Sequence, residues 1–237
     1  MRSARWLGVK DVLAAPRWPA EWPYSSVDFS RQDETNDSDF YSFPRFCYHI
    51  DERAVGALTA YYDKVFGEWQ EPAVLDLCAS HVSHYPRDSK RSRTAALGMN
   101  EVELRENKDV EEWVVQDLNE NPSLPFGDAE FDIVTNAVSV DYLTRPLEVC
   151  REVERVLKPG GAALFALSNR CFPSKAIQIW LRTNDLEHVF IAGSFFHYAG
   201  GFEPPTAAEI SPTARPWIGG TSQNECYLAV VRANKKK

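Results

Sequence analysis

Reactive side chains are concentrated in VLDLCASHVSH, residues 74–84, directly after a short apolar run. The run places Asp76 among aliphatic residues, which is typical of a buried strand. The reactive or polar residues of the loop that follows are Cys78, Ser80, His81, Ser83 and His84. In an α/β protein a loop in this place usually binds a nucleotide-like cofactor, and its glycines adopt left-handed backbone conformations. This loop has no glycine, so we expect it to follow a different path or to bind a cofactor weakly.

His81 and His84 are three residues apart, and both are potential metal ligands. No third ligand at helical spacing lies nearby, and we therefore expect no metal. Because histidine titrates near neutral pH, either ring can instead serve as a general base. The remaining interpretation is that both are hydrogen-bonded loop histidines without a chemical role.

Two further candidates follow a strand expected at residues 131–137. Asp141 and Tyr142 offer a carboxylate and a phenol, which can deprotonate a substrate hydroxyl or orient it. Equally, Asp141 can cap a helix and Tyr142 can belong to the core. The catalytic candidates from the sequence are therefore Asp141, Tyr142 and His84. Arg170, after the next strand, can bind an acidic substrate through two parallel hydrogen bonds.

The elements that must position these residues alternate between strands and helices. Apolar runs predict strands at 73–77, 94–100, 113–118, 131–137 and 162–168, with two more in EPPTAAEISP and ECYLAVVRAN. Helical spacing predicts helices at 51–67, 82–92, 101–107, 146–157, 174–183 and 186–200. The glycine of KPGG is expected to end the helix at 146–157 in a left-handed conformation. Such alternation predicts an α/β fold with a doubly wound, mostly parallel sheet covered on both faces.

Residues 1–48 lack this periodicity and contain several prolines. We expect an irregular, aromatic N-terminal arm at 1–48 and one domain at 49–237. The arm is too aromatic for a disordered tail, so it should pack over the domain or over a partner protein. Its acidic run from Asp33 to Asp39 is most simply a solvated loop. We expect burial of Trp18, of Trp22 and of several of the other aromatic residues Phe29, Phe40, Tyr41 and Phe43.

Composition is that of a soluble globular protein, with 237 residues, 44% hydrophobic, and a formal net charge of -8. An acidic chain argues against general binding to nucleic acid or to anionic membranes. The five cysteines form no CxxC pair, which argues against a disulfide framework or a zinc site and favours a reducing compartment. No apolar run approaches the roughly 20 residues that span a bilayer. The mildly basic N-terminus leaves a transit peptide open, and with it the choice between cytoplasm and chloroplast.

Residues 117–161 contain DLNENPSLPFGDAEFDIV and, after a helix, LKPGG. In order and spacing they resemble the class I S-adenosylmethionine-dependent methyltransferases, and with the flanking elements the resemblance covers roughly residues 50–232. DLCASHVSH, SNRCFPSKAI and FFHYAGGFEPP resemble a poorly characterised plant, algal and bacterial branch of that superfamily. The resemblance implies a Rossmann-like sheet with a last antiparallel strand, here ECYLAVVRAN, and S-adenosyl-L-methionine as cofactor.

The resemblance also implies where the cofactor binds. The loop at 76–84 would face its methionine part, and Asn100 would take the ribose position, which is usually acidic. Asp117 would lie by the adenine amino group, and the residues from Asn136 to Val140 would close over the transferring methyl group. The residues expected to bind the cofactor are Asp76, Cys78, Ser80, Asn100, Asp117, Leu118 and Asn136.

Two functions are consistent with these features. One is methyl transfer to a small-molecule acceptor, in which the protein mainly aligns donor and acceptor and excludes water. The other is a non-catalytic scaffold, an assembly factor or a subunit of a larger complex, since a fold does not fix a function. The glycine-free loop, Asn100 and the aromatic arm favour the second.

Overall fold

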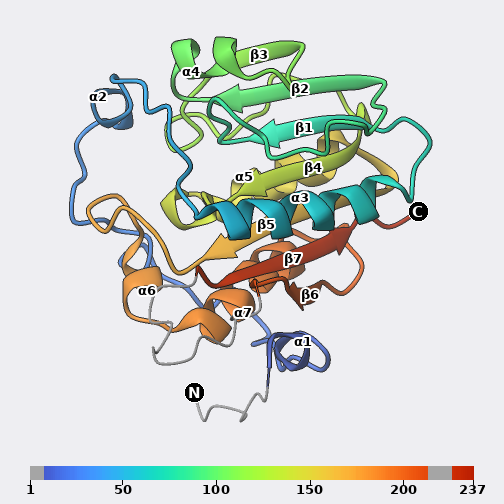
Figure 1. Ribbon diagram of the computed structural model, residues 1–237. Coiled ribbons are helices and arrows are strands. Elements are labelled where there is room, and N and C mark those ends of the chain that lie inside the picture. Colours follow the sequence, from blue (N-terminus) through green and yellow to red (C-terminus); the bar gives the residue numbers. More distant parts are fainter. Residues whose placement is uncertain (1–7, 213–225) are drawn as a thin grey trace, which may run out of the picture.

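The structure is a computed structural model that describes residues 8–212 and 226–237. Its centre is a seven-stranded sheet with the order β3-β2-β1-β4-β5-β7-β6 (Figure 1). β1 to β5 run parallel, while β7 is antiparallel to both of its neighbours, as expected for its position as the last strand. The strands are β1 (Ala73–Leu77), β2 (Arg93–Gly98), β3 (Glu112–Val115), β4 (Phe131–Ala137), β5 (Leu157–Ser168), β6 (Thr206–Glu209) and β7 (Leu228–Asn234).

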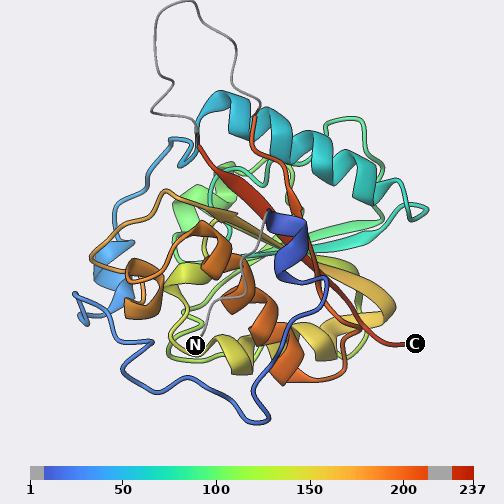
Figure 2. The same ribbon diagram turned by 90° about the horizontal axis from the view of Figure 1, so that it is seen from below.

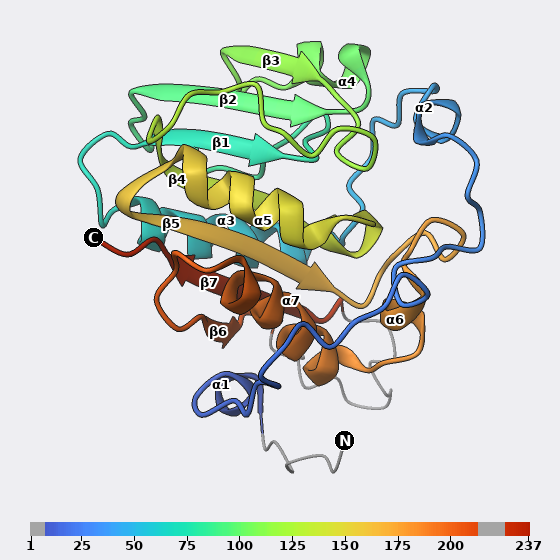
Figure 3. The ribbon, with the colours of Figure 1, turned by 180° about the vertical axis from the view of Figure 1, so that it is seen from behind.

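Helices cover both faces of this sheet. α3 (Glu52–Phe66) lies on one face, and α5 (Pro146–Val156) and α7 (Asp185–Ala199) lie on the other (Figures 1 and 3). α4 (Glu101–Glu106) and α6 (Gln178–Leu181) are shorter. Successive strand residues point to opposite faces, so Val74 packs in the α3 layer while Leu75 packs in the α5 and α7 layer. No helix in the described part of the chain is long and apolar enough to cross a membrane.

The arm contains two short helices, α1 (Val9–Val12) and α2 (Asp37–Phe40). From α1 it runs around the outside of α7 to α2 and then enters α3 (Figure 2). The ring of Trp18 lies 4.6 Å from that of Phe190 on α7, and Trp22 stacks with Phe29 at 5.9 Å. These rings are half-buried against the main core, whereas Phe43 is 78% exposed. Burying such aromatic surface on α7 favours a fixed arm.

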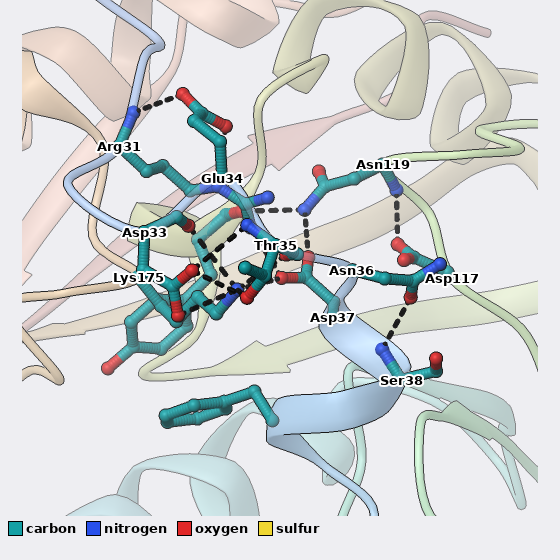
Figure 4. A network of polar contacts seen from close by, with 12 residues as sticks. Arg31, Asp33, Glu34, Thr35, Asn36, Asp37, Ser38, Asp117, Asn119 and Lys175 are labelled. Carbon is teal, nitrogen blue, oxygen red and sulfur yellow. Dashed lines mark hydrogen bonds and ion pairs between the residues drawn. The ribbon is translucent and has the colours of Figure 1, made fainter.

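A cluster of buried charges fixes the middle of the arm (Figure 4), and we call Arg31, Asp37, Asn119 and Lys175 the arm latch. Arg31 Nη1 lies 2.7 Å from both carboxylate oxygens of Asp37, and Lys175 Nζ lies 3.2 Å from Asp37 Oδ1. Asn119 Nδ2 donates to Asp37 Oδ2 at 2.8 Å. The Arg31, Asp37 and Lys175 side chains are 7%, 6% and 1% exposed. The solvated loop expected around Asp37 is therefore wrong at that residue.

Two local structures differ from those that the sequence predicted. Residues 82–92 form no helix, because Ser83 and Tyr85 turn inward to bond Asn107 and Thr135, and Pro86 lacks a backbone donor. KPGG forms the start of β5 rather than a helix cap, although Gly160 is left-handed with φ 81°. The basic residues Arg2 and Arg5 at the N-terminus lie outside the described residues.

Candidate active site

A cleft opens at the carboxyl ends of β1, β2 and β4. The chain winds outward in both directions from between β1 and β4, and open α/β sheets bind ligands at such a point. The cleft measures about 1410 Å³ with its open mouth included. Its walls come from arm residues 37–50 and from the segments that follow β1, β2, β3, β4 and β5.

The loop after β1 turns through a left-handed residue without glycine. Cys78 has φ 57°, a conformation that costs a non-glycine residue about 1–2 kcal/mol. The next amide, Ala79 N, donates to Leu97 O at 2.9 Å, and the Ala79 carbonyl oxygen lies 2.2 Å from where a Cβ on Gly98 would be. The left-handed turn expected to be lost is therefore kept by Cys78. The glycine that allows the close approach is Gly98, at the end of β2.

Asp76 holds this loop from the buried side. Asp76 is 2% exposed, and Thr135 Oγ1 donates to Asp76 Oδ1 at 3.0 Å. Thr135 also bonds the Tyr85 hydroxyl at 2.6 Å. Burial raises the pKa of the Asp76 carboxyl to about 7, against the opposing effect of hydrogen bonds from Ser83 and Thr135. Asp76 lines the inner end of the cleft and ties β1 to β4.

Ser80 joins the loop to α4 and to the arm through Glu103. Ser80 Oγ donates to Glu103 Oε2 at 2.6 Å, and Arg45 N donates to Glu103 Oε1 at 2.6 Å. Glu103 is only 7% exposed although it lines the cleft. Sequence analysis did not single out Glu103, because its partners come from distant segments.

Asn100 uses both ends of its side-chain amide within the protein. Its oxygen caps α4 by accepting from Val102 N at 3.0 Å and Glu103 N at 3.1 Å. Its nitrogen donates to Tyr41 O of the arm at 2.8 Å. Asn100 lines the cleft, yet a ribose contact would have to be made beside these bonds or in exchange for one of them.

Asp117 and Leu118 form the wall that follows β3. Asp117 Oδ1 accepts from Asn119 N at 2.7 Å, and burial raises the pKa of the Asp117 carboxyl. Leu118 is 4% exposed and lines the cleft with Asp117. Asn119 continues into the arm latch, so this wall and the arm are held together.

Two candidates lie behind the cleft rather than on it. Asn136 is 1% exposed and donates from Nδ2 to Leu77 O at 3.3 Å. The cleft is lined instead by the next residues, among them Val138 with φ 47°. Asp141 is 4% exposed, and burial raises the pKa of its carboxyl to about 8. Tyr142 does line the cleft, and its hydroxyl accepts from Phe172 N at 2.8 Å.

His49, His81 and His84, which we call the histidine cluster, line the outer part of the cleft. The ring of Tyr48 lies 5.7 Å from that of His84 and stacks on that of His81 at 6.3 Å. His49 meets Phe172 edge-on at 5.5 Å. The sequence singled out His81 and His84 but missed Tyr48 and His49, because only the fold brings the arm over this loop. The described residues hold no group of three or more His, Cys, Asp or Glu placed to bind a metal.

Residues 75–165 match the methyltransferase domain family, and this segment contains the loop after β1 and the wall after β3. In this segment the chain resembles the class I S-adenosylmethionine-dependent methyltransferases. The chain is 36% identical over 105 residues to the ubiquinone/menaquinone biosynthesis C-methyltransferase UbiE of Roseobacter denitrificans. That match covers 44% of this chain and 35% of the relative, so the chain spans about a third of that protein's length.

Solved structures share the fold. One is phosphoethanolamine N-methyltransferase 2 of Haemonchus contortus in complex with S-adenosyl-L-methionine, with a TM-score of 0.53 and 14% identity over 76% of this chain and 52% of that chain. Another is the [4+2]-cyclase SpnF, with a TM-score of 0.55 and 17% identity over 76% of this chain and 80% of that chain. At these identities the likeness establishes the fold alone.

S-adenosyl-L-methionine is the cofactor of this methyltransferase class, and the cleft residues fit such a molecule. Gly98 and Ala79 line the cleft at the ends of β2 and β1 without bulky side chains, as the close approach of an amino-acid moiety requires. The apolar side chain of Leu118 and the carboxylate of Asp117 suit a purine ring with an exocyclic amine.

Proposed function

We propose that the protein transfers a methyl group from S-adenosyl-L-methionine to a small-molecule acceptor. The observation that supports this most directly is the left-handed turn at Cys78 above Gly98, which preserves the close backbone approach without a loop glycine. A chain that no longer used the cleft would have no need to hold Cys78 in a conformation that costs about 1–2 kcal/mol.

Each wall of the cleft then has a role. When bound, S-adenosyl-L-methionine supplies a sulfonium methyl group, which the acceptor takes to leave a neutral thioether. The backbone of Cys78 to Ser80 faces the methionine part, while Asp117 and Leu118 hold the adenine. Asn100 lies at the ribose position, and the buried carboxylate of Glu103 lies beside it. Asp76 at the inner end of the cleft and Asn136 behind it keep the ends of β1 and β4 together.

A small molecule fits the acceptor side better than a macromolecule does. The arm from Asp37 to Ile50 forms one wall of the cleft, and the net charge of -8 disfavours nucleic acid. The matched relative is named for ubiquinone and menaquinone biosynthesis, and quinone precursors are small aromatic molecules. Aromatic side chains that suit such a molecule line the cleft, namely those of Tyr41, Tyr48, Tyr142 and Phe172.

The second candidate is a non-catalytic scaffold that engages a protein partner through the arm. It is favoured by the aromatic side chains that the arm leaves in solvent, with Phe43 78% and Phe46 55% exposed. Exposed aromatic side chains of this kind are enriched at protein interfaces.

Calorimetric titration with S-adenosylmethionine and S-adenosylhomocysteine separates the two functions. An enzyme binds both, and Asp117→Ala should weaken S-adenosylhomocysteine binding by about 1–3 kcal/mol, the cost of an unmet buried polar group. The absence of a heat of binding at millimolar ligand would favour the non-catalytic scaffold. An unchanged dissociation constant in the folded variant would instead remove Asp117 from the site.

A further inference from the structure

Arg45 is a cation of the arm that lines the cleft without an acidic partner. The residue is half-buried, and its Nη2 donates to Phe40 O at 2.9 Å. Its Nε and Nη1 make no hydrogen bond to the residues that the structure describes, yet neither atom is sealed from solvent. Donors of this kind, on a charged group that faces a cleft, suit an anionic ligand.

The carboxylates around Arg45 have other partners. Asp37 is paired with Arg31 and Lys175 in the arm latch. Glu103 Oε1 accepts from the backbone amide of Arg45 at 2.6 Å and not from its side chain. The chain has a formal net charge of -8, so a shortage of acidic residues does not explain a guanidinium that pairs with none of the described carboxylates.

Aromatic rings fix the orientation of this guanidinium. Its Cζ lies 4.6 Å from the centre of the Phe40 ring, 5.7 Å from that of Phe172 and 5.9 Å from that of Tyr41. Phe40 is the last residue of α2, whose first residue, Asp37, belongs to the arm latch. The latch therefore holds the ring and the carbonyl that position Arg45. Apolar surroundings also strengthen the attraction of the cation for an anion.

One carboxylate joins this part of the arm to the loop after β1. Glu103 Oε2 accepts from Ser80 Oγ at 2.6 Å, while its other oxygen holds the Arg45 amide. In the proposed function this loop faces the amino-acid part of the cofactor, which carries a carboxylate. The loop at 76–84 contains no Lys or Arg, so a cation for that carboxylate has to come from another segment.

We propose that Arg45 binds the carboxylate of the amino-acid part of S-adenosyl-L-methionine, so that the arm supplies part of the cofactor site. The inference rests on the proposed function and adds a residue from outside the matched segment 75–165. Coupling between two events is reciprocal. If the placed arm strengthens cofactor binding through this contact, bound cofactor holds the arm in place by the same free energy.

Calorimetry on the full-length protein with two ligands isolates the carboxylate. S-adenosylhomocysteine carries it, whereas S-adenosyl-3-thiopropylamine keeps the adenosine, the thioether and the ammonium and lacks only the carboxylate. The parent should bind S-adenosylhomocysteine about ten- to hundredfold more tightly, the effect of hydrogen bonds between charged groups. Arg45→Met should lose most of this preference and bind the thiopropylamine like the parent. Arg45→Lys keeps the charge without the planar guanidinium and should keep part of the preference.

Arg105→Met is the matched control, because Arg105 on α4 is 61% exposed, pairs with Glu101 and does not line the cleft. It should keep the preference of the parent. Limited proteolysis gives a second readout. In the parent, S-adenosylhomocysteine should slow cutting of the arm more than the thiopropylamine does, and in Arg45→Met the two ligands should act alike.

Three results would overturn the inference. They are a parent that binds both ligands equally, an Arg45→Met variant that weakens both by the same factor, and a loss of the preference in Arg170→Met in place of Arg45→Met. The second result would leave Arg45 as a structural residue of the wall, and the third would move the carboxylate to the segment after β5. A parent that binds neither ligand would overturn the proposed function, and this inference with it.

Discussion

The carbonyl oxygen of Ala79 lies over Gly98, 2.2 Å from the position that a Cβ on residue 98 would occupy. The amide of the same residue bonds Leu97 O at 2.9 Å, so the loop after β1 rests on the end of β2 through its backbone. This contact sets the height of the loop above the sheet. The shape of the inner cleft therefore depends on a glycine outside the loop.

Gly98→Ala should displace the loop, because the contact is with backbone and no flexible side chain can yield. We expect the free energy of unfolding to fall by about 1–3 kcal/mol, the usual cost of overpacking, and S-adenosylhomocysteine binding to weaken. Gly56→Ala is the matched control, since Gly56 lies inside α3 with nothing within 4 Å. It should raise stability by about 0.5–1 kcal/mol. Equal effects of the two changes in chemical denaturation would contradict this role of Gly98.

Comparing Cys78→Gly with Cys78→Ala measures the energetic cost of the left-handed backbone at residue 78. Both remove the thiol, but only glycine accepts φ 57° without strain. We expect the glycine variant to be the more stable by about 1–2 kcal/mol, the reverse of the usual order of these two residues. Denaturant unfolding in the presence of a reductant measures the difference. A more stable alanine variant would show that the turn is not left-handed.

Asn100→Asp separates two roles of one side chain. The aspartate still caps α4, but it cannot donate to Tyr41 O, and its charge would face that carbonyl. Limited proteolysis should therefore cut the arm near residue 41 faster than in the parent. Asn100→Ala loses the cap as well and should be less stable by a further 0.5–2 kcal/mol or so. Tighter S-adenosylhomocysteine binding by Asn100→Asp, despite a looser arm, would place the ribose at this residue.

The arm latch predicts an unequal response to two substitutions. Asp37→Asn leaves the buried cations of Arg31 and Lys175 without their shared anion and should cost about 3–5 kcal/mol. Lys175→Met leaves the Arg31–Asp37 pair intact and should cost less. Lys108→Met, at a side chain that is 82% exposed, is the control. Thermal unfolding ranks the stability of the three variants. In limited proteolysis the arm should be cut fastest in Asp37→Asn, because that variant holds the arm least firmly against the cleft.

The sequence predicted the sheet well because its strands are short runs of buried aliphatic residues. The ends of β1 and β4 agree with the predicted 73–77 and 131–137. The arm latch could not be predicted, since Asp37 and Lys175 are far apart in the chain and Arg31 beside Asp37 in the sequence does not reveal that both are buried. Only the fold makes a buried ion pair of two residues that separately look solvated.

The candidate site was predicted in part for the same reason. Residues on a strand end, such as Cys78 and Asp117, are placed by the order of elements and do line the cleft. Asn136 and Asp141 were expected in the cleft but lie behind it, because a shift of one position along the chain moves a side chain from one side to the other. Tyr48, His49 and Glu103 were missed because they face the cleft only after the arm has packed on α4 and on the loop after β1.

Two buried carboxyls give stability a pH dependence with a definite sign. Burial raises the pKa of Asp76 to about 7 and that of Asp141 to about 8, from an ordinary value of 3.8. Between pH 4 and these values the unfolded chain has lost protons that the folded chain keeps, so the free energy of unfolding falls as pH rises. His84, with its pKa lowered to about 4, opposes this trend below pH 6.5, where the unfolded histidine gains a proton that the folded one does not.

The fall in the free energy of unfolding should therefore be clearest between pH 6.5 and 8, where the two buried carboxyls titrate and His84 no longer opposes them. Asp141→Asn, which mimics the protonated form, should flatten the profile between pH 7 and 8, by at most about 1.4 kcal/mol per pH unit. Asp76→Asn should flatten only the part below pH 7, because that carboxyl is already ionised in the folded protein above it. Asp88→Asn, on an exposed turn, serves as the control and should keep the parent profile. Urea titrations at half-unit pH steps measure this, and a parent whose stability rises from pH 6.5 to 8 would show that neither carboxyl is buried in its neutral form.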